Sequence, residues 1–119
     1  KDDSKAAIPE HVSEAVRVAA EFAWKHYHEH IGLSEAAEAA GVNASYLSYL
    51  FSQEMGVGFS AFLLNQRISQ ARKLLVKTSL SVKEIASKSG FNDYQYFSKI
   101  FKKQVGLSPV RYRQTSSKN

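Results

Sequence analysis

The stretch SGFNDYQYFSKIFKK, residues 89–103, combines a glycine turn with a one-sided helical pattern. Its apolar residues Phe97, Ile100 and Phe101 recur at the three- and four-residue spacing of a helix face that packs against a core. The opposite face carries tyrosine, glutamine, serine and three lysines, and no acid follows Asp93. Ordinary solvated surfaces mix charges of both signs. The pattern therefore predicts a helix whose polar face meets a negatively charged partner.

A fainter copy of this stretch, AGVNASYLSYLFSQ, lies about fifty residues earlier. Residues 33–43 align with residues 82–92 at an offset of 49, and from Tyr46 onward the offset is 50. The identical pairs are Glu35/Glu84, Ala37/Ala86, Gly41/Gly90, Asn43/Asn92, Tyr46/Tyr96, Ser48/Ser98, Phe51/Phe101 and Gly56/Gly106. We infer a duplicated unit, with one residue added just inside the later helix of the second copy.

Each copy has the pattern of a short helix, a tight turn and a longer helix. In the second copy, SVKE at residues 81–84 is a capping box that predicts a helix start. Gly41 and Gly90 supply the left-handed residue after the short helix. Asn43 and Asn92 are expected to cap the longer helix. This arrangement is a helix-turn-helix, present twice.

The remaining segments also have helical spacing, and sustained period-two alternation is absent. Residues 9–30 are predicted to form one long helix with Pro9 in its opening turn, and residues 59–76 a second. The predicted fold is all-α, with two helix-turn-helix subdomains joined by a long connecting helix. The expected boundaries are a tail at 1–8, a first subdomain at 9–57, a connecting helix at 58–77, a second subdomain at 78–114 and a tail at 115–119.

Charge is divided unevenly between the two halves of this 119-residue chain. Residues 1–63 hold four Lys/Arg against nine Asp/Glu, a net −5, whereas residues 64–119 hold twelve against two, a net +10; together they give the overall +5. A split of this size points to a polyanionic partner for the second half. The absence of cysteine excludes disulfides and thiolate metal sites. No apolar run reaches the roughly 18 residues of a membrane span, and the polar start does not look like a signal peptide, so a cytoplasmic location is expected.

These residues resemble the DNA-binding domain of the AraC/XylS family of bacterial transcription regulators. The family's spacing is visible in GFNDYQYFSKIFKKQVGLSPVRYR, residues 90–113, and in the connecting segment around Arg67. The resemblance covers residues 9–114 and implies seven helices. It also implies that the chain is the output domain of a longer regulator, an activator that contacts RNA polymerase, and that the isolated domain is monomeric.

The resemblance places the later helix of each unit in a major groove of double-stranded DNA. In the second unit, the family's base-contacting positions fall on Tyr94, Gln95, Ser98 and Lys99. Gln95 suits an adenine edge, Lys99 a guanine and Tyr94 a thymine methyl. The phosphate-contacting residues are expected to be Lys102, Lys103 and Arg111, which position the protein without reading sequence.

In the first unit the corresponding base-contacting positions are Ser45, Ser48 and Tyr49. The sequence departs from the family here, because residues 33–62 contain no Lys or Arg. Either this helix reads bases through hydroxyls and apolar contact, or it binds weakly and contributes less. Core packing is an alternative role for Tyr49, since aromatic side chains are usually at least partly buried. Arg67 is interpreted as structural, and Arg72 and Lys73 as solvated.

Two other classes of function compete with DNA binding. His26 and His30, four residues apart with Glu29 adjacent, have the spacing of two metal ligands on one helix face, but no third ligand is apparent. No phosphate-binding glycine loop or nucleophile–base pair is present either, so neither an enzyme nor a cofactor is expected. A basic helical protein-interaction or membrane-surface module is the second alternative. It requires a broad exposed apolar face, whereas these apolar stripes are needed to close two small cores.

Overall fold

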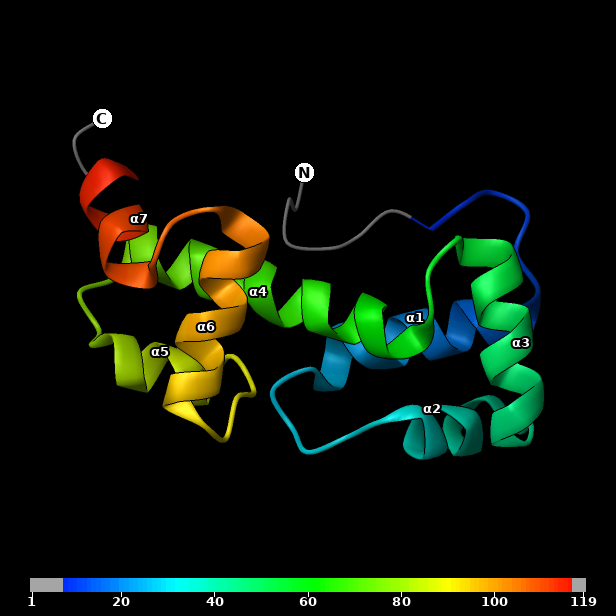
Figure 1. Cartoon of the computed structure of the whole chain (residues 1–119). Coiled ribbons are helices and arrows are strands. Elements are labelled where there is room, and N and C mark those ends of the chain that lie inside the picture. Colours follow the sequence, from blue (N-terminus) through cyan, green and yellow to red (C-terminus); the bar gives the residue numbers. More distant parts are fainter. Residues whose placement is uncertain (1–7, 117–119) are drawn as a thin grey trace. The chain divides into compact units, whose positions relative to one another are not determined.

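The computed structural model describes residues 8–116, which form seven helices and no strand (Figure 1). The all-α class and the seven helices agree with the prediction. The chain divides into two compact units, and the boundary between them in the sequence falls within α4, between Gln66 and Arg67. The helices are α1 (Glu14–His26), α2 (Leu33–Ala40), α3 (Ala44–Met55), α4 (Phe59–Lys77), α5 (Val82–Lys88), α6 (Tyr94–Val105) and α7 (Pro109–Ser116).

The core of the first unit is built from α1, α2, α3 and the first part of α4. Phe51 of α3 lies at its centre and meets Phe59 and Phe62 of α4 edge to face, with ring centroids 5.5 and 5.4 Å apart. Small side chains line the helices around it, which lets the backbones approach closely. The buried residues are Val16, Ala19, Ala20, Ala23, Ala36, Ala37, Leu47, Phe51, Phe59, Phe62 and Leu63.

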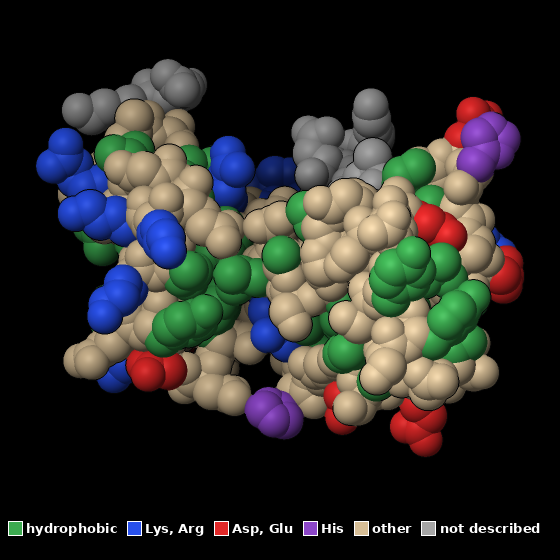
Figure 2. Space-filling view, turned by 45° about the vertical axis from the view of Figure 1, so that its right-hand side comes forward, with side chains coloured by type: hydrophobic (Ala, Val, Ile, Leu, Met, Phe, Trp, Pro, Cys, Tyr) green, Lys and Arg blue, Asp and Glu red, His purple; other side chains and the backbone are tan. Residues whose placement is uncertain are grey.

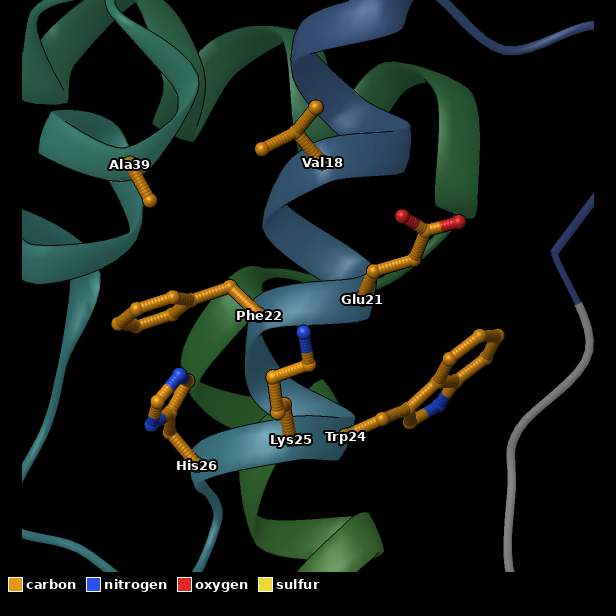
Figure 3. A pocket seen from close by; sticks show the side chains of 7 residues that line it. All are labelled: Val18, Glu21, Phe22, Trp24, Lys25, His26 and Ala39. Atoms are coloured by element: carbon orange, nitrogen blue, oxygen red, sulfur yellow. The ribbon is translucent and has the colours of Figure 1, made fainter.

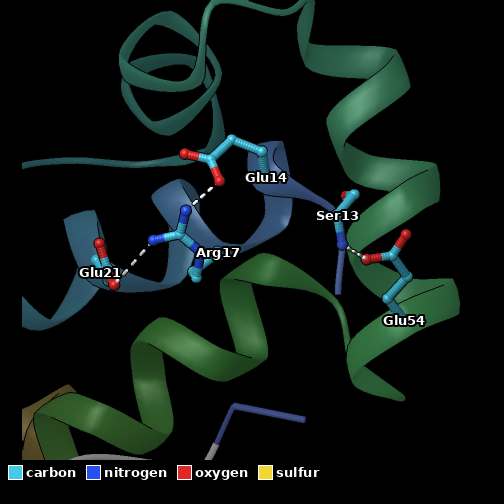
Figure 4. A network of polar contacts seen from close by, with 5 residues as sticks. All are labelled: Ser13, Glu14, Arg17, Glu21 and Glu54. Atoms are coloured by element: carbon cyan, nitrogen blue, oxygen red, sulfur yellow. Dashed lines mark hydrogen bonds and ion pairs between the residues drawn. The ribbon is translucent and has the colours of Figure 1, made fainter. Parts of the chain in front are cut away.

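The first helix is shorter than predicted, since α1 runs from Glu14 to His26 and not over residues 9–30. Ser13 is extended, and its backbone N–H donates to the carboxylate of Glu54 at 2.6 Å, a partner 41 residues away in the sequence (Figure 4). This bond satisfies a donor at the helix start. Pro9 therefore lies ahead of the helix, in a segment whose Ile8 packs against the core.

The outer face of α1 begins with a charged network at its first two turns. Arg17 donates to Glu14 and, at 3.5 Å, to Glu21 (Figure 4). Both carboxylates raise the pKa of the Arg17 guanidinium, and the hydrogen bond that Arg17 donates to Glu14 is the largest cause. The network is exposed to solvent, so it contributes little to stability.

A chain of aromatic rings holds the second unit together. Phe91, from the turn, meets Phe97 of α6 with ring centroids 4.9 Å apart. Phe97 meets Phe101 at 5.6 Å, and Phe101 meets Tyr112 of α7 at 5.6 Å. The row thus fixes one face of α6 against the rest of this unit. The other buried apolar residues of the unit are Ile68, Ala71, Leu75, Ile85, Ala86 and Pro109.

The residue added in the second copy lies in the turn and not inside the later helix, which corrects the prediction. α3 and α6 are both twelve residues long and start fifty positions apart. Asn43 caps α3 as expected, by accepting from the N–H of Tyr46 at 2.7 Å. In the second unit the cap is Asp93 and not Asn92, because the Asp93 carboxylate accepts from the first N–H groups of α6. Asn92 is therefore the extra residue.

The predicted turn geometry before these caps is confirmed. Gly41 and Gly90 have φ angles of 72° and 99°, which residues with a side chain rarely adopt. The capping box is present as well. The Glu84 N–H donates to the Ser81 hydroxyl at 3.1 Å, while the Ser81 N–H donates to the Glu84 carboxylate at 3.0 Å.

The closing helix α7 is bonded to the end of α4. Arg113 donates from Nε to the carbonyl oxygen of Leu75 at 3.0 Å and from Nη2 to that of Thr78 at 3.2 Å. Arg72 is exposed, in agreement with its interpretation as solvated, and it also donates to the hydroxyl of Tyr112 at 3.2 Å and lies over the Tyr112 ring. α7 continues to Ser116, two residues past the predicted subdomain boundary, and residues 1–7 and 117–119 of the predicted tails lie outside the described residues.

Candidate nucleic-acid interface

The outward face of α6 displays the side chains expected to contact bases. Tyr94, Gln95 and Lys99 are exposed, and Ser98 is half-buried beside them. None of these four side chains makes a hydrogen bond or ion pair with another residue of the range 8–116. The buried Phe97 and Phe101 hold the opposite face, so the polar face is directed to solvent. The structure thus brings together the predicted base-contacting residues of the second unit.

Lys102 and Lys103, at the end of the same helix, are exposed and also without a partner among the described residues. The two acids of the second unit do not neutralise them, because each is engaged at a helix start: Glu84 at α5 and Asp93 at α6. Lys and Arg side chains accordingly gather on the second unit, as Figure 2 shows. This surface has the electrostatic character of a polyanion-binding site.

Arg111 projects from the first turns of α7. Its backbone N–H donates to the hydroxyl of Ser108 at 3.2 Å, which caps the helix, and Pro109 occupies the position where a missing N–H costs nothing. The Arg111 side chain is exposed and makes no hydrogen bond or ion pair with another described residue. It is therefore available to a phosphate group, as expected from the sequence.

On α3, the predicted residues Ser45, Ser48 and Tyr49 are all exposed. The Tyr49 side chain retains 65% of its accessible surface, which excludes the alternative that it packs in the core. Figure 2 shows mainly acidic residues among the charged side chains over the first unit, whereas Lys and Arg predominate over the second unit. The exposed faces of α3 and α6 belong to helices of the same length but differ in charge.

Two exposed tyrosines were not among the predicted site residues. Tyr46 on α3 and Tyr96 on α6 are 50% and 49% exposed and occupy equivalent positions. Tyr96 also contacts Phe91, with ring centroids 6.3 Å apart. Burial lowers the pKa of Arg67, and the charge of Tyr96 opposes this shift, so the two side chains lie near each other at the start of the second unit. The sequence repeat could have indicated these two residues, because Tyr46 and Tyr96 are one of its identical pairs.

The histidine segment does not form a metal site. α1 ends at His26, so His26 and His30 do not share a helix face, and the premise of the metal alternative is wrong. His26 instead pairs with the carboxylate of Glu29 at 2.8 Å, which lowers the pKa of that carboxyl. Within residues 8–116 no group of three or more His, Asp or Glu residues is placed to bind a metal ion.

A depression of about 610 Å³ crosses the outer face of α1 in the first unit. Phe22 and Trp24 extend from opposite sides of the helix, and Glu21 and Lys25 rise between them (Figure 3). Because the lining side chains splay outward, they present no converging constellation of the kind that catalysis requires.

No helix among the described residues is long and apolar enough to cross a membrane.

Comparison with known proteins decides the family. A family model for a helix-turn-helix domain of the AraC type matches residues 36–115, well over half of the chain. The chain belongs to the AraC family of transcription regulators. The arabinose operon regulatory protein of Salmonella typhimurium is 37% identical over 84 residues, which are 71% of this chain and 30% of that protein. This AraC-type chain spans under a third of the length of the curated relatives that it first matches.

Solved structures carry the same AraC-type domain. The C-terminal domain of AraT, a response regulator from Geobacillus stearothermophilus, is similar with a TM-score of 0.86 and 37% identity, covering 89% of this chain and 88% of that chain. The DNA-binding domain of AdpA, solved in complex with a target DNA, has a TM-score of 0.81 and 28% identity, covering 87% and 93%. The family assignment makes this chain a DNA-binding regulator domain and not an enzyme.

Proposed function

We propose that this domain binds double-stranded DNA in a sequence-specific way, with α6 as its principal reading helix. The observation that carries the proposal is the unpartnered polar face of α6, which combines Gln95 and Lys99 with a lysine pair at the helix end. An amide side chain pairs well with an adenine edge and an ammonium group with guanine. The size of an α-helix suits the major groove, where these edges are displayed.

The contacts separate into two kinds. Tyr94, Gln95, Ser98 and Lys99 on α6 read bases, whereas Lys102, Lys103 and Arg111 neutralise phosphates. In the first unit, Ser45, Ser48 and Tyr49 of α3 are the base-contacting residues. Because the two units are tandem copies within one chain, we expect one monomer to protect an asymmetric site of about two successive major grooves.

The test is selection of bound duplexes from a random pool, followed by titration of the selected duplex by fluorescence anisotropy. We expect enrichment of one asymmetric site and loss of preference in a Gln95→Ala/Lys99→Ala double variant. Lys25→Ala is the control, because it removes a positive charge from the exposed face of α1 and should leave the preference unchanged. Failure to enrich any sequence would contradict the proposal. Binding to anionic vesicles as tight as binding to the selected duplex at physiological salt would also contradict it, because such binding is expected of a membrane-surface module.

We further propose that the domain is the output part of a longer cytoplasmic regulator that activates transcription through RNA polymerase. The greater length of its curated relatives supports the place in a longer chain, and the family resemblance implies activation. Transcription in vitro from a promoter with the selected site upstream tests this role. Transcript should increase with the full regulator, and a decrease would show repression instead.

A further inference from the structure

α3 and α6 are two copies of one helix that differ on their outward faces. Each has twelve residues and ends at a glycine cap, so every residue of α3 has its counterpart fifty positions later in α6. Ser48 and Ser98 are identical. Gln95 and the three lysines of α6, however, correspond in α3 to uncharged residues of different chemistry. The pairs that differ are Ser45/Gln95, Tyr49/Lys99, Ser52/Lys102 and Gln53/Lys103.

The exchange leaves α3 without the means for ionic contact. No Lys or Arg occurs in residues 33–62, and Glu35 and Glu38 are exposed on the neighbouring α2. Neutralisation of phosphates and cation–guanine bonds both require a positive side chain. Neither can come from this helix. If α3 contributes to base recognition, it does so through uncharged side chains.

Apart from the amide of Gln53 near the end of the helix, at the position of Lys103, the exposed groups that α3 offers are aromatic rings and hydroxyls. Tyr49, at the position of Lys99, is 65% exposed, and Tyr46 beside it is 50% exposed. Neither side chain makes a hydrogen bond within the described residues. The serine hydroxyls donate or accept and so pair with any base edge. The apolar group of the major groove that a ring can contact is the 5-methyl group of thymine.

We propose that α3 reads its half of the site through thymine methyl groups, contacted by Tyr49 with Tyr46 alongside, and without ionic contact; the inference rests on the proposed DNA binding. Two consequences follow. The half-site under α3 contains thymine at the position of Tyr49. Its contribution to affinity changes little with salt concentration, unlike that of the lysine-bearing α6.

The experiment replaces thymine by deoxyuridine in the selected duplex, one half-site at a time, which removes only the methyl groups. The α3 half-site is the one whose base changes remain unaffected by Gln95→Ala. With the unaltered protein, uracil in this half should raise Kd about fourfold for each contacted methyl. In Tyr49→Ala and Tyr49→Gln, uracil at the thymine under Tyr49 should have no effect on Kd, whereas Tyr49→Phe and Lys99→Ala should keep the effect.

Three results would overturn the inference. These are an unchanged Kd with uracil under α3, an equal uracil effect in Tyr49→Ala, and selected sites without thymine in this half. Because Tyr49 is exposed, its variants are expected to fold, and helical circular dichroism checks each one. If the protein binds no duplex at all, the proposed function itself is wrong. This outcome is distinct from the three above, in which the protein binds DNA but α3 does not read thymine methyl groups.

Discussion

Arg113 in α7 donates from Nε to the carbonyl oxygen of Leu75 in α4 at 3.0 Å. Leu75 is within the last turn of α4, where carbonyl groups have no donor inside the helix. The guanidinium thus supplies a missing partner and adds a positive charge at the negative end of the helix. This bond, with a second one to Thr78, fixes α7 and therefore the base from which Arg111 extends.

Arg113→Met should destabilise the second unit by about 1–3 kcal/mol, because two carbonyl groups lose a charged donor. Urea unfolding followed by circular dichroism measures the change. Arg111→Met is the matched control. The Arg111 side chain is exposed and makes no hydrogen bond or ion pair with a described residue, so the unfolding free energy of this variant should change by under about 0.5 kcal/mol while its affinity for DNA falls. Equal destabilisation by the two variants would show that the bonds to α4 contribute nothing.

Asp93→Ala should cost about 1 kcal/mol of stability through loss of the cap of α6. Asp93→Asn should retain most of it, because Asn43 performs the same role on α3. Asn92→Ala, one residue earlier, is the control and should be close to neutral. These free energies come from denaturant titration. A larger loss for Asn92→Ala than for Asp93→Ala would move the cap back to the position predicted from the sequence.

Ala86→Leu should cost roughly 1–3 kcal/mol, since Ala86 is only 2% exposed on α5 and a larger side chain overpacks the unit. Hydrogen exchange should show faster opening of the second unit before the first. Ala61→Leu, on the exposed side of α4, is the control and should leave both units unchanged. Unchanged exchange in Ala86→Leu would argue against close helix packing at this position.

The pH dependence of stability should include a contribution from Glu84. Hydrogen bonding with Ser81 lowers the pKa of the Glu84 carboxyl in the folded state below its usual 4.5. The contribution is therefore present above the unfolded-state pKa and is lost as pH falls through the folded-state value. Glu84→Gln should thus reduce stability at pH 7 more than at pH 3. A pH-independent effect of Glu84→Gln on the unfolding free energy would exclude this linkage.

The parts of the fold that the sequence predicted depend on local chemistry. Interactions within a few residues determine the helical spacing, the capping box at Ser81 and the glycine turns. The repeat and the order of the helices could therefore be predicted from the sequence. The parts that were wrong or not predicted depend on distant partners. The start of α1, which was predicted too early, is set by Glu54, 41 residues away, and the bond from Arg72 to Tyr112, 40 residues away, was not predicted.

The candidate site divides in the same way. The polar face of α6 follows from helical periodicity, and its exposure was predictable from the sequence. Exposure of Tyr49 was not, because an aromatic residue suits a core as well as a surface. The position of the extra residue in the turn also escaped prediction, since Asn92 and Asp93 are both good caps and only the backbone geometry distinguishes them.

A base-pair scan of the selected duplex tests the central claim most directly. Affinity is measured for every single substitution, with the unaltered protein, Gln95→Ala and Lys102→Ala, at several salt concentrations. Changes under α6 should cost more than changes under α3. Gln95→Ala should lose about 1–3 kcal/mol mainly at one base pair, whereas Lys102→Ala should weaken all duplexes alike and lower the salt slope by about one. Equal sensitivity of both halves, or a change of sequence preference in Lys102→Ala but not in Gln95→Ala, would contradict the account.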